Sequence, residues 1–413
     1  MMTLGMDATS PVRLIATLCT AQVLVQIGAF FWPALLPEMI GRWRLTNSEA
    51  GWVTAAFYGA YMLAVPILVT LTDRIDAKRV YLGGVAAMIL GHAMFATLAD
   101  GFWSALVARS LTGIGWAGTY MTGLKLLADE VDAKTLSRAA AWHAASIGIS
   151  GALSYVCAEL LANTGGWRVA FAAASASAMM AWIIVMLAVP SRGRIPTIAT
   201  AGTSMFDFRP VLRNRSAMAY AVAYGLHTLE MAALRGWGVA FLAYVAVSTG
   251  ASHSIMSPTM TLTVLALVGT LASLAGNEAA IHFGRRALIS AAIGGSVFLA
   301  VLLALFGVQS YPLAVALMLA YGAVIWLDSA SLTAGTAGTA EPSRRGATLA
   351  VHSSLGYAGG FIGPLLVGLV LDLAGGEAAA WTIAFASIAA VMFASLLIFL
   401  IMRPRVLAGD RGA

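Results

Sequence analysis

The sequence has little charge: Asp, Glu, Lys and Arg together make up 10% of its 413 residues, while hydrophobic residues make up 60%. A soluble domain carries about 25% charged residues, so most of the surface of this chain cannot face water. The length alone would suggest two or three soluble domains. The composition excludes them, and with them a large soluble catalytic domain.

Cysteine is also scarce, since the chain has only Cys19 and Cys157. Both fall inside apolar runs, so no disulfide framework is predicted. The sequence also lacks a His/Asp metal cluster, a nucleophile elbow and a Walker loop. We therefore expect no enzyme, no catalytic residues, no resident metal and no cofactor.

Apolar runs bounded by charge, Gly or Pro are the main positive feature of the sequence. Each is long enough to cross the roughly 30 Å hydrocarbon core of a bilayer. We therefore predict an all-α integral membrane protein with twelve transmembrane helices and both termini on one side. The predicted spans lie near residues 14–40, 49–72, 79–99, 102–127, 139–163, 167–189, 217–247, 257–282, 287–308, 312–338, 346–373 and 379–402.

The longest polar interruption falls between the sixth and seventh spans. It divides the chain into an N-terminal six-helix bundle (1–189), a cytoplasmic linker (190–215) and a C-terminal six-helix bundle with a short cytoplasmic tail (216–413). These boundaries are predictions from composition alone.

Positive charge predicts the orientation. Of the 24 Lys and Arg residues, only Arg42, Arg44 and Arg168 fall in loops on the side opposite the termini, while Arg109 and Arg235 fall within spans. Cytoplasmic loops carry the excess of Lys and Arg in membrane proteins, so both termini are predicted to be cytoplasmic. We expect a multi-pass protein of a bacterial-type inner (plasma) membrane. The net charge of +6 thus indicates topology, not a nucleic-acid partner.

The loop between the second and third spans carries a recognisable pattern. It keeps an acidic–basic core at Asp73 and Arg74 and ends in two basic residues, while Val69 and Asp76 stand where glycines are usual. With two six-span halves, this loop resembles the G-x-x-x-D-R-x-G-[RK]-[RK] pattern of the major facilitator superfamily. The resemblance implies two pseudo-symmetric bundles, alternating access, and a gate latch at Asp73 and Arg74.

Span four adds a second similarity, because Arg109, Gly113 and Gly115 match that family's R-x-x-x-G-x-G pattern, whose arginine is often tied to proton coupling. Proton-driven drug exporters of the family usually carry G-x-x-x-G-P in span five. Here span five has Gly148 and Gly151 without a following proline. This departure favours import over export.

Four ionisable residues stand out within the predicted spans: Arg109, Glu230, Arg235 and Asp328. A charge at mid-bilayer costs about 2.5–3.5 kcal/mol on insertion scales, so each is a functional candidate. By the resemblance, spans one, four, seven and ten line a central cavity where these charges would meet. We predict Glu230 and Asp328 as proton-coupling residues. The predicted substrate-binding residues are Gln22, Gln26, Arg109, Trp116, Tyr120, Tyr224, His227, Arg235 and Tyr321.

Arginine is suited to bidentate recognition of a carboxylate. The sequence thus favours a proton-coupled importer of a small anionic organic solute, working as a monomer in the lipid bilayer. A purely structural role is the alternative for two of these residues. Arg109 could cap carbonyls of a neighbouring helix, and Asp328 could bond to nearby serines.

Two other transport functions remain as alternatives. The acids and aromatic residues would also suit a proton-driven exporter of lipophilic or cationic drugs. A minor alternative is copper import, since His227 and Met231 lie one helical turn apart and soft ligands suit Cu(I).

Overall fold

The computed structural model describes residues 11–72, 74–131, 133–191, 208–251, 256–375, 377–407 and 410–411, and their regular structure is entirely helical. The first half of the chain contains α1 (Pro11–Gln26), α2 (Phe31–Ala34), α3 (Leu36–Trp43), α4 (Asn47–Leu71), α5 (Ala77–Leu98), α6 (Phe102–Glu130) and α7 (Ala133–Ala188). The second half contains α8 (Arg209–Arg213), α9 (Arg215–Ser248), α10 (Pro258–Phe283), α11 (Arg285–Phe306), α12 (Tyr311–Ile325), η1 (Trp326–Asp328), α13 (Ser329–Thr339), η2 (Pro342–Arg344), α14 (Arg345–Leu373) and α15 (Ala378–Met402).

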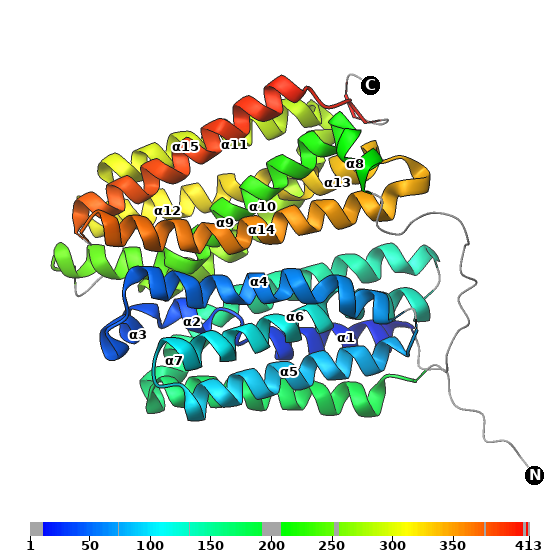
Figure 1. The fold of residues 1–413 in the computed structure, drawn as a ribbon, viewed down its shortest axis with the longest axis horizontal. Coiled ribbons are helices and arrows are strands. Elements are labelled where there is room, and N and C mark those ends of the chain that lie inside the picture. The colour runs from blue at the N-terminus through cyan, green and yellow to red at the C-terminus, as the bar shows by residue number, and fades with distance from the viewer. Residues whose placement is uncertain are drawn as a thin grey trace, which may run out of the picture.

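The all-α class predicted from the sequence is confirmed. Figure 1 shows α1–α7 as one layer of long, roughly parallel rods and α9–α15 as a second layer beside it. Within the described residues, nine helices are long and apolar enough to cross a membrane. The count of twelve is not reproduced exactly. α1 is shorter than a full span, α6, the fourth predicted span, is not among the nine, and α7 unites the fifth and sixth predicted spans as two helices that meet at Gly165 and Gly166.

Local capping explains where the helices begin. Thr46 forms a capping box with Glu49 at the start of α4, which satisfies amide groups that a helix N-terminus leaves unpaired. Asp76 caps α5 by accepting a hydrogen bond from the backbone N–H of Lys78 at 2.9 Å. The aspartate that replaces a glycine of the loop pattern therefore starts a helix. Lys78 then donates to the Val189 carbonyl at 2.6 Å and ties α5 to the end of α7.

Glycines let α14 pack tightly on α9. A methyl group at Gly359 would clash with the backbone carbonyl of Gly225. In lipid, no hydrophobic force drives helices together, so close backbone approach at small residues is the main source of packing energy. This packing fixes α9, which carries His227 and Glu230.

The two bundles are joined at the end where α4 begins and α14 ends, here named the Asp372 end. Asp372 accepts hydrogen bonds from the backbone N–H groups of Asn47 at 2.9 Å and Ser48 at 2.7 Å. Glu159 of α7 accepts one from Ser257, beside α10, at 3.0 Å. Both contacts link a carboxylate of one bundle to a helix start in the other.

The opposite end is here named the Arg285 end. Toward it, the last turns of α4 are exposed or half-buried, whereas the first half of the same helix is largely buried. The bundles therefore share more buried surface near the Asp372 end. Of the predicted linker 190–215, residues 190–191 and 208–215 are described, and α8 lies there at the Arg285 end.

Candidate functional site

A break in the first span holds one buried arginine. Residues 27–30 separate α1 from α2, and Pro33 follows within α2. Proline lacks the N–H that would bond the carbonyl four residues earlier, which here is that of Ala29. Arg109 of α6 donates to this carbonyl through Nη1 at 3.1 Å. The arginine thus replaces a missing backbone hydrogen bond.

Arg109 is only 2% exposed, and its guanidinium carbon lies 4.4 Å from the centre of the Phe57 ring. Arg109 therefore bonds a carbonyl of a neighbouring helix, which was one of the roles considered from the sequence. Its Nε donor is left without a partner among the described residues. A buried unused donor is costly unless another group binds it.

Arg235 of α9 approaches the same region from the other bundle. Its guanidinium carbon lies 5.2 Å from the ring centre of Phe30, in the break of the first span, and 4.9 Å from that of Trp326 in η1. The side chain is half-buried. Arg235 and Glu230 turn to different partners, as expected for residues five apart on a helix.

Two tyrosines border the arginines. Tyr58 meets Phe57, the ring beneath Arg109, edge-on with ring centres 5.5 Å apart. Tyr155 donates to the Arg235 carbonyl at 2.9 Å and stacks on Phe30 with ring centres 5.4 Å apart. We name Arg109, Arg235, Tyr58 and Tyr155 the arginine site. It draws residues from α4, α6, α7 and α9, hence from both bundles.

An aromatic cluster continues from the arginine site along the bundle interface. Trp116 stacks on Phe57 at 4.8 Å, lies 6.5 Å from Tyr120, and meets Tyr357 of α14 edge-on at 6.2 Å. The Trp116 Nε1 donor has no partner among the described residues. Trp116 thus presents a buried polar atom close to residues of both bundles.

Tyr224 lies on the C-terminal side of this cluster. It stacks on His352 with ring centres 3.9 Å apart and lies 6.0 Å from His227. His352 also lies 3.0 Å from the Thr336 hydroxyl. His352 therefore has two partners, Tyr224 and Thr336, that the sequence did not suggest.

The acids lie inside the C-terminal bundle. Glu230 is 1% exposed and accepts a hydrogen bond from the Tyr321 hydroxyl at 2.7 Å. Its second oxygen, Oε2, has no hydrogen-bond partner among the described residues. The nearby Ser296 hydroxyl donates to the Ile293 carbonyl instead.

Asp328 lies where the tenth predicted span changes from α-helix to the 3₁₀ segment η1. Its Oδ1 is 3.0 Å from Nδ1 of His227, and both side chains are almost fully buried. A mid-span stretch of 3₁₀ helix often marks a functional hinge. We name Glu230, Tyr321, His227 and Asp328 the acid network.

The remaining predicted residues fall in other places. Gln22 is fully buried and accepts from Tyr81 at 3.3 Å, so it faces the interior of the N-terminal bundle. Gln26 is buried at the end of α1, and its Nε2 lacks a partner within the described chain. Of the predicted gate latch, Arg74 is exposed and Asp73 lies outside the described residues. The latch thus remains a prediction.

Sequence reasoning missed several members of the site, chiefly Phe30, Tyr58, Tyr155 and Tyr357. A signal existed for the first, since Gly28 and Pro33 inside one apolar run indicate a helix break. No comparable signal marks the tyrosines, because their role depends on which helices become neighbours.

Comparison with known proteins adds family information. The family model for the Major Facilitator Superfamily matches residues 18–252. Protein spinster homolog 1 from Homo sapiens is 24% identical over 251 residues, which cover 58% of this chain and 47% of the relative. A probable 4-methylmuconolactone transporter from Cupriavidus pinatubonensis is 28% identical over 146 residues, 33% of each chain. The chain therefore matches about half the length of the spinster homologues.

Solved structures agree on the fold. The nucleoside transporter NupG, as its D323A mutant, superposes with a TM-score of 0.78 at 14% identity, covering 94% of this chain and all of the other. A bacterial homologue of the human lysosomal transporter Spinster, in an inward-facing and occupied conformation, gives 0.72 at 16% identity, covering 95% and 96%. The family match and the apolar helices of spanning length together identify a multi-pass membrane protein. The chain belongs to the major facilitator superfamily.

Proposed function

We propose that this protein is a proton-coupled secondary transporter that moves a small organic solute with a carboxylate or similar anionic group by alternating access. Import is favoured over export. The protein would work as a monomer in a bacterial-type inner membrane, with the Arg285 end and both termini in the cytoplasm. The N-terminal bundle (1–189), linker (190–215) and C-terminal bundle (216–413) are the proposed units.

One observation carries the proposal: two arginines from different bundles converge on the break in the first span. Arg109 of α6 bonds the Ala29 carbonyl, and Arg235 of α9 lies over the ring of the next residue, Phe30. An anion bound between them would neutralise both charges and connect the bundles. Arginine suits this role because its planar donors match a carboxylate in bidentate geometry. The unused Nε of Arg109 is available for that bond.

The acid network would carry the proton. Glu230 and Asp328 are buried beside a phenol and an imidazole, which can donate to or receive protons from a carboxylate. Trp326 of η1 packs on Arg235, and Asp328 lies in the same 3₁₀ segment. A change in the charge of Asp328 would therefore reach the arginine site through η1.

The relatives support a small organic solute. They include a bacterial homologue of a lysosomal transporter, a nucleoside transporter and a probable 4-methylmuconolactone transporter. The last solute class is organic and oxygen-rich, which fits an arginine site better than a lipophilic cation would.

The alternative of cationic-drug export has weaker support. Glu230 lines a cavity with Trp237, Phe241 and Trp381, yet its volume is about 30 Å³. That is room for one or two water molecules and not for a drug. Copper import has less support still, because His227 is paired with the hard carboxylate oxygen of Asp328, whereas Cu(I) favours soft ligands.

Proton movement into proteoliposomes would test the proposal. The purified protein is reconstituted with a trapped pH dye, and two pools are added in turn: small carboxylates with inorganic anions, and lipophilic cations. We expect acidification with the anion pool alone, and its loss in Arg109→Ala. A response to cations only would establish the exporter instead.

A further inference from the structure

A groove lies on the outer surface of the C-terminal bundle at the Arg285 end. It has a volume of about 410 Å³ and runs between the start of α11 and the end of α15. Phe399 and Leu400 of α15 and Ala287 of α11 form its apolar wall. Arg286 and Arg411 lie at the same groove, and both are exposed.

The end of the chain is held at this groove by a buried ion pair. Arg285 donates to both carboxylate oxygens of Asp410, at 2.9 Å from Nε and 3.0 Å from Nη2. These side chains are 4% and 3% exposed. The backbone N–H of Arg411 donates to the Ile281 carbonyl at 3.0 Å. Bidentate pairs of this kind are among the stronger hydrogen-bonded contacts, so Arg411 is held in place at the groove.

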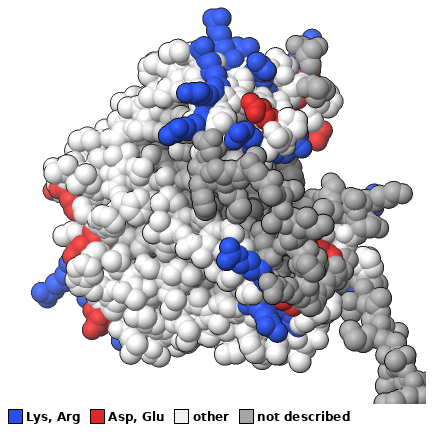
Figure 2. Space-filling view, turned by 45° about the vertical axis from the view of Figure 1, so that its right-hand side comes forward, with Lys and Arg blue, Asp and Glu red and all other residues white. Residues whose placement is uncertain are grey.

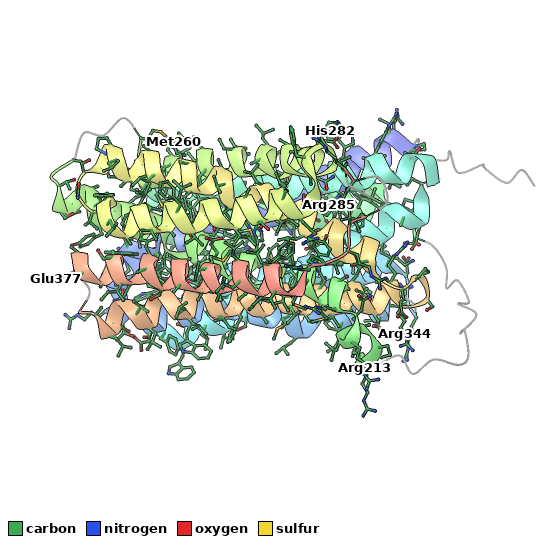
Figure 3. All side chains as sticks on the ribbon, turned by 90° about the horizontal axis from the view of Figure 1, so that it is seen from above. Arg213, Met260, His282, Arg285, Arg344 and Glu377 are labelled. Carbon is green, nitrogen blue, oxygen red and sulfur yellow. The ribbon has the colours of Figure 1, made fainter. Side chains whose placement is uncertain are left out.

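The charge of the groove is positive after this pairing. Asp410 neutralises Arg285, which leaves Arg286 and Arg411 without compensation from that carboxylate. At the same end of α15, Arg215 and Arg403 border a second hollow, which shares Leu400 with the first. Figure 2 shows Lys and Arg gathering over this part of the surface, and Figure 3 places Arg285 and Arg344 toward the same end.

We propose that this groove binds the headgroup of an anionic phospholipid from the membrane leaflet at the Arg285 end. The phosphate would lie between Arg286 and Arg411, and an acyl chain would follow the apolar wall of α15. Basic pockets at the ends of transmembrane helices bind such headgroups. The inference depends on the chain spanning a membrane and not on the proposed solute or on proton coupling.

The shape of the groove favours a lipid over a free anion. Its lining includes exposed apolar side chains, Phe283 at 70% and Leu400 at 46%, and Ile401, at 68%, lines the second hollow together with Leu400. These residues would gain nothing from a small water-soluble phosphate, whereas an acyl chain would cover them. One molecule with an anionic head and an apolar tail therefore satisfies both surfaces.

Native mass spectrometry of the purified full-length protein would test this. The wild type is titrated with phosphatidylglycerol, phosphatidylethanolamine or glycerol phosphate, beside the double variant Arg286→Gln/Arg411→Gln. Each basic side chain near an anionic lipid surface contributes roughly fivefold, so the double variant should bind phosphatidylglycerol about thirtyfold more weakly. Arg213→Gln, which removes an exposed arginine outside the groove, is the matched control and should bind as the wild type does.

Equal binding of both phospholipids by the wild type, or an unchanged affinity in the double variant, would overturn the proposal. Binding of glycerol phosphate as strong as that of phosphatidylglycerol would identify a free-anion site instead. If the double variant fails to fold, the salt dependence of lipid binding by the wild type tests the proposal. Its preference for phosphatidylglycerol must fall as salt is raised, because exposed charges are screened.

Discussion

The two charged regions of this protein differ in how they are built. The arginine site lies between the bundles and takes its residues from both, whereas the acid network lies within the C-terminal bundle and takes its residues from α9, α12 and η1. Arg109 is bonded to a backbone carbonyl, while Glu230 and Asp328 are each paired with a side chain.

In the proposed mechanism, this difference separates the two tasks of a coupled transporter. A group between the bundles changes its surroundings when the bundles rock, so a solute bound there responds to the conformation. A group inside one bundle keeps its neighbours during the same movement. We infer that the arginine site senses solute and the acid network stores the proton, with η1 between them.

Removing Arg109 should have the largest effect. Arg109→Ala deletes a buried, charge-assisted donor, which is worth about 1.5–3 kcal/mol, so the solute-dependent proton signal should fall at least tenfold. Arg109→Lys should recover little of it, because an ammonium lacks the planar donor pair. Arg42→Gln is the control, since Arg42 pairs with Glu38 on the exposed surface. A normal signal in Arg109→Ala would exclude Arg109 from the solute site.

Glu230→Gln should divide the two tasks. The amide keeps the shape of the side chain and can still accept the hydrogen bond from Tyr321. It cannot take up or release a proton during the transport cycle. We expect accumulation driven by a pH gradient to be lost, while exchange of labelled solute continues. Tyr321→Phe should reduce accumulation by roughly tenfold, since it removes one hydrogen bond to an acid. If Glu230→Gln still accumulated solute, the proton would have to be carried elsewhere.

Asp372→Asn tests the contact between the bundles without touching either charged site. Hydrogen bonds to a charged group contribute about 1.5–3 kcal/mol, so the Asp372 end should open more often. Spin labels at Arg42→Cys and Glu377→Cys, in a background lacking Cys19 and Cys157, would report longer distances. Glu341→Gln, at the Arg285 end, should leave the distances unchanged. Identical distributions in Asp372→Asn would show that this carboxylate does not hold the bundles together.

Gly359→Ala should have the smallest effect, on stability. The added methyl meets the Gly225 carbonyl and pushes α14 from α9, at a cost of about 1–3 kcal/mol. We expect a lower melting temperature in detergent. Gly346→Ala in the same helix meets nothing within 4 Å and should melt as the wild type does. Equal melting of both variants would argue against tight packing of these helices.

Local features of the fold were predictable from the sequence. The apolar runs gave the helices, because bilayer thickness sets their length. Arg109, Glu230, Arg235 and Asp328 were identified as buried or half-buried charges, because the cost of a charge in lipid makes each conspicuous.

The partners of these charges were not predictable. Glu230 and His227 lie three residues apart on α9, yet the structure pairs Glu230 with Tyr321 and His227 with Asp328. These partners lie far apart in the chain, and their pairing depends on how helices rotate and pack. The bond from Arg109 to Ala29 likewise requires a helix break and a particular helix neighbour.

A double-mutant cycle on solute binding is the most direct test of the central claim that arginines from both bundles hold one anion. Affinity for the solute identified from the anion pool would be measured by calorimetry for wild type, Arg109→Gln, Arg235→Gln and the double variant. Residues that share a ligand are coupled, typically by about 0.5–3 kcal/mol. We predict that the double variant loses less affinity than the sum of the single losses. Strictly additive losses, or full affinity in Arg235→Gln, would contradict a shared site.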